Sequence, residues 1–221
     1  MPPLDAQDLP ARVRLVVLFG GRSAEHDISC ISARHVLQAV DPDRYEVVPV
    51  GITRAGRWVL AEAAAELLGQ GRRGELPASV APEGPAVDPL ALVATSPPPE
   101  PAVPTVVLPI LHGPNGEDGT VQGLLEMADV PYVGSGVLGS AVAMDKAAAK
   151  TVLDAHGIPQ VRWRAVGAHE LDRPGLAEEL FADLGPVLFV KPANMGSSIG
   201  VTRGTAVDDL PAALHAAAAF D

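Results

Sequence analysis

At residues 13–21 the chain reads VRLVVLFGG, an apolar run broken by one arginine and ended by two glycines. Such a run predicts a buried strand that enters a tight turn. A helix is expected next, capped by Asp27 or Ser29, with apolar residues at helical spacing as far as residues 41–43. Residues 45–52 then predict a second strand. Strand, glycine turn, helix and strand open a doubly wound parallel sheet, in which ligands bind beyond the carboxyl ends of the strands.

The same pattern returns after a loop-rich interruption. A short helix is predicted at residues 62–68, whereas residues 69–104 are rich in glycine and proline and predict a loop-heavy insert. A strand is predicted at residues 106–111, a helix capped by Thr120 follows, and residues 130–133 predict another strand. The first half of the chain is therefore expected to be an α/β domain.

The remaining residues predict shorter elements. Helices are expected at residues 140–156 and near residues 176–184, and the pair Asp208 and Asp209 is expected to cap an alanine-rich helix that reaches Phe220. Three short strands are predicted at residues 161–166, 187–191 and 199–202.

From Lys191 the chain reads KPANMGSSIGV, which predicts a strand end, a turn rich in donors and a second apolar start. Pro192 disfavours the helical region for Lys191 and holds it extended. Gly196, Ser197 and Ser198 let the backbone approach a ligand and turn its N–H groups toward an anion. The combination indicates phosphate binding, although a Gly-Ser-Ser turn taken alone is more often a simple hairpin loop.

The basic residues are strongly biased, with three lysines and therefore 16 − 3 = 13 arginines. In such a chain a lysine indicates a place where a compact point charge is needed and a planar guanidinium would not serve. Lys146 and Lys191 stand where a nucleotide-binding fold needs an ammonium. Lys150 lies four residues after Lys146 on the same predicted helix and is expected to face solvent.

Composition argues against several classes of function. Sixteen basic and 27 acidic residues give a net charge of −11, which opposes nucleic-acid binding. The single cysteine, Cys30, leaves no internal disulfide, fits a reducing compartment and is expected to be a packing residue. Residues 1–10 lack the basic and apolar regions of a secretory signal, and no apolar stretch is long enough for a membrane span. A cytoplasmic protein without a membrane or nucleic-acid partner is expected.

Five motifs occur along the chain in one order: GGRSAEHDIS at residues 20–29, HGPNGEDG at 112–119, YVGSG at 132–136, MDK at 144–146, and KP at 191–192 with GSS at 196–198. Together they resemble the D-alanine:D-alanine ligase family, over residues 15–201 apart from the insert. The resemblance implies a doubly wound, Rossmann-like substrate domain over residues 1–136. It also implies an incomplete α+β ATP-grasp subdomain over residues 137–221, without its carboxy-terminal part.

The resemblance implies a chemistry as well. In that family ATP phosphorylates the carboxylate of one D-alanine, and the amine of a second D-alanine attacks the acyl phosphate and expels phosphate. The product, D-alanyl-D-alanine, is used in peptidoglycan precursors. By this resemblance Lys146 and Lys191 would hold the ATP phosphates, and the loop of Gly196, Ser197 and Ser198 would close over them.

The first D-alanine has its own expected residues. The resemblance implies that Glu25 and Ser197 position this substrate through its ammonium, as catalytic and substrate-binding residues, and that His112 lies near its carboxylate. A charge-assisted hydrogen bond to a carboxylate such as Glu25 is stronger than a neutral one. Taken alone, Glu25 fits better a helix-start residue that complements the helix dipole, and His112 fits an ordinary loop histidine equally well. Glu117 and Asp118 are expected to stabilise their glycine-rich turn and not to bind metal.

One part of the family pattern is missing from the sequence. Mg²⁺ (or Mn²⁺) would bridge phosphate oxygens, yet no carboxylate cluster follows Gly200, so the metal ligands are expected outside this chain. The 221 residues by themselves are therefore expected to release no phosphate from ATP with D-alanine. The resemblance implies a homodimer and favours D-alanine as second substrate, with D-serine and D-lactate left open.

Two other classes of protein compete with the ligase. A non-catalytic nucleotide-binding half-module would keep the phosphate loop without the chemistry. An NAD-dependent dehydrogenase would use the glycine turn at Gly20 and Gly21, but Arg22, Ser23 and Ala24 follow in place of the G-x-G-x-x-G spacing. The dehydrogenase is therefore the weakest hypothesis.

Overall fold

The computed structural model describes residues 10–89 and 103–220 of the 221-residue chain. The chain divides into two compact units, Met1–Val137 and Leu138–Asp221. Each unit has a hydrophobic core of its own. The substrate-domain role expected of residues 1–136 and the ATP-grasp role expected of residues 137–221 stay predictions.

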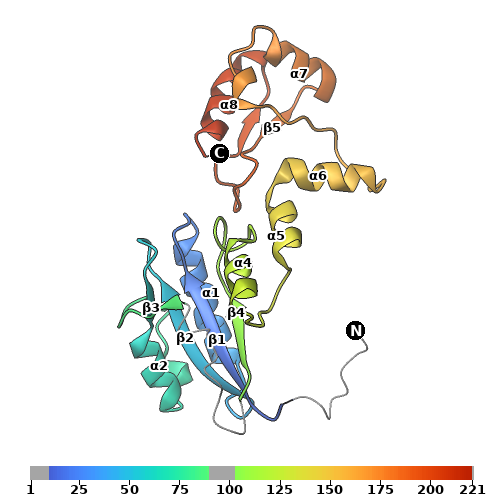
Figure 1. Cartoon of the computed structure of the whole chain (residues 1–221). Helices are drawn as coiled ribbons and strands as arrows, with labels where there is room; N and C mark the ends of the chain where they lie inside the picture. The colour runs from blue at the N-terminus through green and yellow to red at the C-terminus, as the bar shows by residue number, and fades with distance from the viewer. Residues whose placement is uncertain (1–9, 90–102, 221) are drawn as a thin grey trace. The chain divides into compact units, whose positions relative to one another are not determined.

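The first unit is built on a four-stranded sheet of order β3-β2-β1-β4 (Figure 1). Its parallel strands are β1 (Val13–Gly20), β2 (Tyr45–Ile52) and β4 (Thr105–Pro109), and β3 (Trp58–Leu60) adds antiparallel to β2. Gly20 pairs with Ile52, so β1 and β2 end together. Residues that follow the parallel strands therefore gather at one edge of the sheet.

Helices cover both faces of this sheet. They are α1 (His26–Ala39) and α2 (Glu62–Gly69) on one face and α4 (Thr120–Met127) on the other. Alternate residues of β1 point into the two cores: Val17 and Phe19 pack with α1 and α2, and Leu18 packs with α4. All three side chains are fully buried. This arrangement confirms the predicted doubly wound sheet, with β1 at its centre.

The second unit has smaller elements. They are α6 (Lys146–Ala155), α7 (Leu176–Leu184), β5 (Leu188–Val190), β6 (Thr202–Gly204) and α8 (Leu210–Ala218), preceded by α5 (Val137–Met144). Strands β5 and β6 pair antiparallel. Leu176 and Leu180 of α7 pack with Leu210 and Leu214 of α8, and this core also contacts β5. The predictions of a strand at 187–191 and a helix at 176–184 are confirmed.

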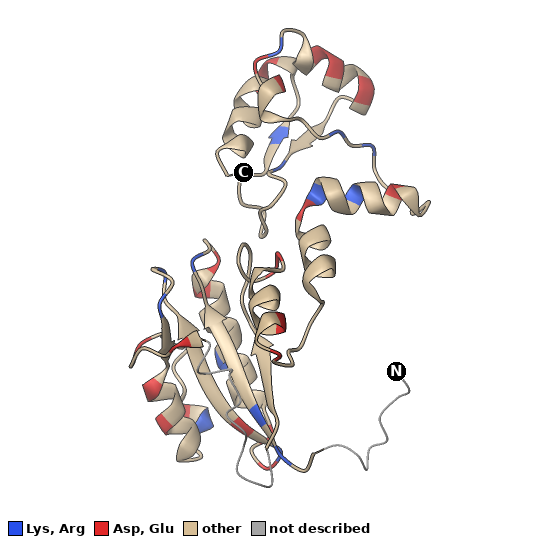
Figure 2. Ribbon diagram, in the orientation of Figure 1, with Lys and Arg blue, Asp and Glu red and all other residues tan. Residues whose placement is uncertain are grey.

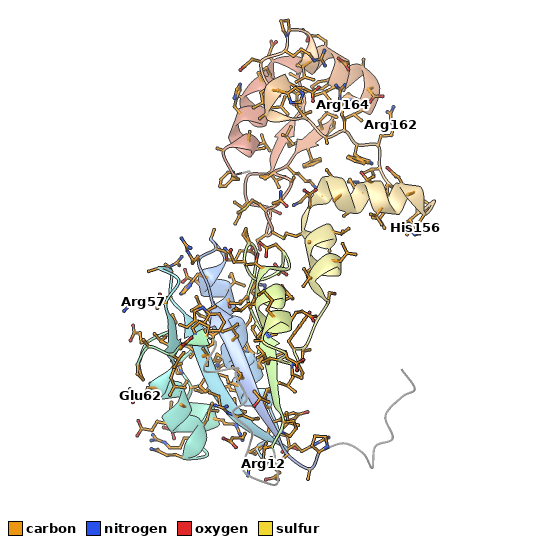
Figure 3. All side chains as sticks on the ribbon, in the orientation of Figure 1. Arg12, Arg57, Glu62, His156, Arg162 and Arg164 are labelled. Atoms are coloured by element: carbon orange, nitrogen blue, oxygen red, sulfur yellow. The ribbon has the colours of Figure 1, made fainter. Side chains whose placement is uncertain are left out.

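Ion pairs connect the segment that precedes α7 to that helix. Arg164, labelled in Figure 3, forms ion pairs with Glu170 at 3.3 Å and with Glu179. Arg173 forms a further ion pair with Glu179 at 2.5 Å. Figure 2 shows the acidic positions along α7. Hydrogen bonds from Arg164 and Arg173 lower the pKa of Glu179. Because these side chains are partly exposed to solvent, each pair contributes little to stability.

The single helix predicted at residues 140–156 is wrong, because the chain forms α5 and α6 with a break at Asp145. Asp145 has an extended backbone, and its carboxylate accepts a hydrogen bond from the N–H of Ala148 at 2.8 Å. The first amides of a helix have no partner within the helix, so an aspartate that accepts one of them stabilises a new start. Lys146 thereby becomes the first residue of α6.

The predicted caps of two other helices are also wrong. Helix α1 begins before Asp27 and Ser29, and α4 begins at Thr120 itself, after a left-handed Gly119. Ser29 has a tertiary role instead: its buried hydroxyl accepts a hydrogen bond from the Gly20 N–H at 2.8 Å and donates to the Ile110 carbonyl at 2.5 Å. The side chain thus joins the end of β1 to the segment after β4.

Several short elements differ from the predictions as well. Residues 130–133 form a single bridge, between Tyr132 and Val107, residues 161–166 are irregular, and the strand predicted at 199–202 begins only at Thr202. Asp209 accepts hydrogen bonds from the N–H groups of Thr205 and Ala206, so its carboxylate stabilises the turn before α8. Strand β3 was not predicted, because three residues are too few to show an alternating pattern.

Part of the predicted insert at residues 69–104 lies outside the residues that the structure describes. Residues 90–102, with the proline run at 97–99, are outside the described residues, and so are residues 1–9, for which the sequence predicts no secretory signal. The described residues 69–89 contain a 3₁₀ turn at Arg73–Glu75 and a bridge from Ala86 to Val59.

Candidate functional site

The first unit has a cavity beyond the carboxyl ends of its parallel strands. Its volume is about 320 Å³, and the residues around it include Gly21, Ile52, Trp58, Leu111, His112 and Val121. A parallel sheet with helices on both faces binds ligands at this position. Of the predicted site residues, His112 lies in the cavity wall.

Glu25 lies in the turn between β1 and α1 and is 6% exposed. It occupies the position before the first helical residue, as the dipole interpretation expects, but its side chain makes no capping hydrogen bond to α1. A Cβ added at Gly113 would stand 2.7 Å from Glu25 Oε2, so the carboxylate reaches the loop that follows His112. The side chain therefore points toward that loop and does not cap the helix, and its role in the site stays a prediction.

Ser23 joins the two loops that carry Glu25 and His112. Its hydroxyl donates to the backbone carbonyl of His112 at 2.7 Å and accepts from the Glu25 N–H at 3.2 Å. The ring of His112 extends toward α1, with Nε2 3.4 Å from Ser32 Oγ. The structure therefore brings Glu25 and His112 to the same edge of the sheet. Sequence reasoning missed Ser23, although it lies within the GGRSAEHDIS motif.

The acidic residues of the neighbouring turn have structural partners. Glu117 accepts a hydrogen bond from the Gly113 N–H at 2.6 Å, and Asp118 accepts from the N–H groups of Asn115 at 2.8 Å and Thr120 at 3.0 Å. Burial opposes the ionisation of Asp118, but these backbone hydrogen bonds outweigh it and lower its pKa. The prediction that both acids stabilise the turn is confirmed.

No cluster of three or more His, Cys, Asp or Glu side chains within residues 10–89 and 103–220 could hold a metal ion. Cys30, a residue of α1, is buried in the core between that helix and the sheet, and burial, followed by the charge of Asp27, raises its pKa to about 11. A buried neutral thiol of this kind is a packing residue, as predicted.

In the second unit, Lys146 contacts the loop that follows β5. Its ammonium donates to the carbonyl oxygens of Met195 at 2.5 Å and Ala193 at 3.2 Å, and its backbone N–H donates to Ala193 at 3.1 Å. The break at Asp145 makes this contact possible, because it places Lys146 at the start of α6. Lys191 directly follows β5 and is exposed. The start of α6 and the loop from Lys191 onward therefore belong to one local structure.

The glycine-serine part of this loop is a chain of tight turns. The Ile199 N–H bonds to the Gly196 carbonyl at 3.0 Å, and the Val201 N–H bonds to the Ser198 carbonyl at 3.3 Å. Ser197 and Ser198 are both left-handed, with φ of 46° and 60°. Residues other than glycine rarely adopt this backbone conformation, which costs on the order of 1–3 kcal/mol for each residue. Such geometry is typical of loops whose backbone N–H groups face an anion.

Lys150 does not face open solvent, so that prediction is wrong. Its ammonium donates to Gln160 Oε1 at 3.3 Å and lies 5.8 Å from the centre of the Trp163 ring. The irregular segment after α6 folds back and half buries the side chain. Lys150 therefore contacts the segment after α6, whereas the Lys146 ammonium contacts the loop after β5.

The fold is that of the ATP-grasp ligases, present in part. The family model "D-ala D-ala ligase N-terminus" matches residues 14–135, and "D-ala D-ala ligase C-terminus" matches residues 152–221. The chain therefore belongs to the D-alanine–D-alanine ligase family, as the sequence motifs predict.

Named relatives agree with this membership. The chain is 49% identical over 219 residues to a D-alanine–D-alanine ligase of Kineococcus radiotolerans, covering 94% of this chain and 58% of the relative. It is 47% identical over 224 residues to the ligase of Mycolicibacterium smegmatis, covering 96% and 58%. The chain thus spans less than two thirds of the length of the relatives it matches.

Solved structures give the same result. The D-alanine-D-alanine ligase of Coxiella burnetii matches with a TM-score of 0.77 and 30% identity, covering 95% of this chain and 61% of that one. The VanG D-Ala:D-Ser ligase of Enterococcus faecalis matches with a TM-score of 0.71 and 31% identity, covering 93% and 59%. Among the helices of the described residues, none is both long and apolar enough to cross a membrane.

Proposed function

We propose that this chain supplies the ATP-phosphate loop and the first-substrate residues of an ATP-dependent D-alanine:D-alanine ligase. The contact of the Lys146 ammonium with the backbone of residues 193–195 carries the proposal, because it joins a cation to the loop that carries Gly196, Ser197 and Ser198. Membership of the ligase family supports the same assignment.

In the proposed ATP site, Lys146 and Lys191 bind phosphate oxygens beside the backbone N–H groups of Gly196, Ser197 and Ser198. An ammonium has three donors, and Lys146 uses two of them on carbonyls, so one remains for a phosphate. An ammonium about 4 Å from a phosphate oxygen gains on the order of 4 kcal/mol at an effective dielectric near 20, before desolvation. This gain is large enough to make each lysine important for affinity.

The first D-alanine is assigned to Glu25 and His112 of the first unit, and the role of Ser197 toward that substrate stays a prediction of the family resemblance. The buried Glu25 carboxylate accepts hydrogen bonds from the substrate ammonium, and His112 lies near the substrate carboxylate. That carboxylate attacks the γ-phosphorus of ATP, the bond to the bridging oxygen breaks, and ADP leaves with an acyl phosphate formed. The amine of a second D-alanine, having lost its proton, then attacks the acyl carbon and expels phosphate.

Phosphoryl transfer also uses Mg²⁺ (or Mn²⁺), which neutralises the phosphate oxygens when it is bound. The described residues do not fit a metal site, since they lack a cluster of ligands. The metal is therefore assigned to none of them. A homodimer in the cytoplasm, serving peptidoglycan precursor synthesis, completes the proposal.

The second substrate has one specific alternative. The VanG D-Ala:D-Ser ligase is 31% identical to this chain and the Coxiella burnetii D-alanine ligase is 30% identical, so these residues do not separate the two substrates. D-alanine is proposed because the relatives nearest 50% identity bear that name.

Nucleotide titration of the 221-residue chain tests the ATP site. Lys191→Ala is expected to weaken ATP binding by about 10- to 100-fold, because a hydrogen bond to a charged group contributes roughly 1.5–3 kcal/mol. Lys150→Ala is the matched control, since that lysine packs on Gln160 and Trp163, and it is expected to keep the affinity of the wild type. An unchanged affinity in Lys191→Ala contradicts the assignment.

Mass and turnover separate the ligase from a non-catalytic half-module. A denatured polypeptide chain of mass well above 22.8 kDa, from a protein that releases phosphate with ATP and D-alanine, supports the ligase. A denatured polypeptide chain of 22.8 kDa, from a protein that binds ATP and releases no phosphate, supports the half-module.

A further inference from the structure

Gly200, at the end of the proposed phosphate loop, lies between the rings of Pro192 and Phe220. A Cβ added to Gly200 would stand 2.7 Å from Pro192 Cγ and 2.8 Å and 3.0 Å from Phe220 Cδ2 and Cε2. A side chain at this position would therefore require the Pro192 or Phe220 ring to shift, so glycine fits the packing as it stands. Gly200 is also left-handed, with φ of 69°. The end of the loop at Gly200 thus lies beside both Pro192, near its beginning, and the Phe220 ring.

Phe220 is held in place by the helix before it. Its N–H bonds to the Ala217 carbonyl at 3.1 Å, and α8 is anchored in the core by Leu210, Leu214 and Ala217. The side chain is nevertheless 48% exposed, which is high for a phenylalanine that merely fills a core. Pro192, in contrast, is buried. The ring therefore lies at the surface of the unit, over the base of the loop.

The loop needs such support because its own conformation is unfavourable. Ser197 and Ser198 are both left-handed, and backbones of this kind persist where the surrounding structure holds them. Lys146 holds the first half of the loop through Ala193 and Met195. At the other end of the loop, Gly200 has Phe220 as its neighbour.

We propose that Phe220 is a positioning residue for the phosphate loop: it fixes the base of the loop so that the N–H groups of Gly196, Ser197 and Ser198 are presented to ATP. This inference rests on the proposed ATP site. Phe220 does not touch the nucleotide in this account. It raises affinity by removing conformations of the loop in which the N–H groups point elsewhere.

Paired titrations with ATP and with adenosine test the role of Phe220. Phe220→Ala is expected to weaken ATP binding by about tenfold and to leave adenosine binding unchanged, because only the phosphates meet the loop. Phe220→Leu, which keeps an apolar side chain over Gly200, is expected to recover most of the ATP affinity. Val161→Ala, at a side chain that is 79% exposed in the same unit, is the control and is expected to change neither affinity.

Hydrogen exchange gives a readout that needs no nucleotide. The N–H groups of Ile199 and Val201, bonded within the loop, are expected to exchange faster in Phe220→Ala and at the wild-type rate in Phe220→Leu. A wild-type chain that binds no ATP contradicts the proposed function. In that case faster exchange of the Ile199 and Val201 N–H groups in Phe220→Ala still supports a role of Phe220 in holding the loop, and unchanged exchange contradicts it. ATP binding by the wild type, with equal affinity and equal exchange in Phe220→Ala, overturns the inference about Phe220 alone.

Discussion

The two units hold their candidate functional residues in different ways. In the first unit the substrate-binding candidates lie at the end of a sheet whose central strand is buried on both faces, and Ser23 links the two loops by hydrogen bonds. In the second unit the phosphate loop connects two strands of three residues each and is contacted by Lys146 and Phe220. Core packing supports the first set, and a few individual contacts support the second. Substitutions should therefore affect stability in the first unit and ligand affinity in the second.

The largest expected effect is a loss of stability at the centre of the first unit. Phe19→Ala removes a side chain with 0% exposure and is expected to cost about 3–5 kcal/mol. Phe189→Ala, on β5 of the second unit at 60% exposure, is expected to stay within about 0.5 kcal/mol. The chain has two tryptophans, Trp58 and Trp163. Fluorescence during urea unfolding therefore follows Phe19→Ala in a Trp163→Phe background, which reports the first unit, and Phe189→Ala in a Trp58→Phe background, which reports the second unit. Equal costs at the two phenylalanines would refute the contrast between the units.

A smaller effect is expected at the start of α6. Asp145→Ala removes the acceptor for the Ala148 N–H and is expected to cost about 1 kcal/mol. It should also weaken ATP binding, because the same start places Lys146 on the loop. Asp145→Asn keeps an acceptor oxygen and should restore both properties. Unfolding is followed by Trp163 fluorescence in a Trp58→Phe background, and ATP affinity is followed by titration. A stability loss without any change in ATP affinity would separate the helix start from the loop.

The smallest effect concerns the ion pairs before α7. Hydrogen bonds from Arg164 and then Arg173 lower the pKa of Glu179 in the folded state. Their stabilisation is therefore fully present above the ordinary glutamate pKa and is lost as the pH falls through the lowered value. A carboxyl NMR titration of Glu179 measures this pKa directly. Arg164→Gln is expected to raise it toward the ordinary value, and a Glu179 pKa that does not move would show that the pair has no electrostatic effect.

Long apolar patterns predicted their elements well. The run that ends at Gly20 forms the central strand, and the region of residues 45–52 forms β2 with the same bounds, because eight residues buried on one or both faces leave a clear pattern. Short elements were predicted poorly. Strand β3 has only three residues, too few for an alternating pattern, and the single bridge at Tyr132 depends on Val107, a partner in another element that a local pattern does not show.

Helix starts were the other weak point. Asp145 lies within a continuous alanine-rich pattern, which concealed the start of a new helix. Ser29 has a side chain that often caps helices, but its hydroxyl instead makes hydrogen bonds to the end of β1 and to the segment after β4. A serine or aspartate can bond to the amides of its own helix or to groups elsewhere, and the choice depends on what lies within reach in three dimensions.

The sequence by itself determined the family, the doubly wound sheet and the residue types of the candidate site, because motif spacing and hydrophobic periodicity are local properties of the chain. Only the tertiary structure decided that Lys146 lies on the carbonyls of Ala193 and Met195, that Ser23 joins Glu25 to His112, and that Phe220 covers Gly200. Each of these contacts joins segments that are separate in the sequence or in different elements. Their formation depends on how whole helices and strands pack, and the packing is set by burial of side chains throughout each unit.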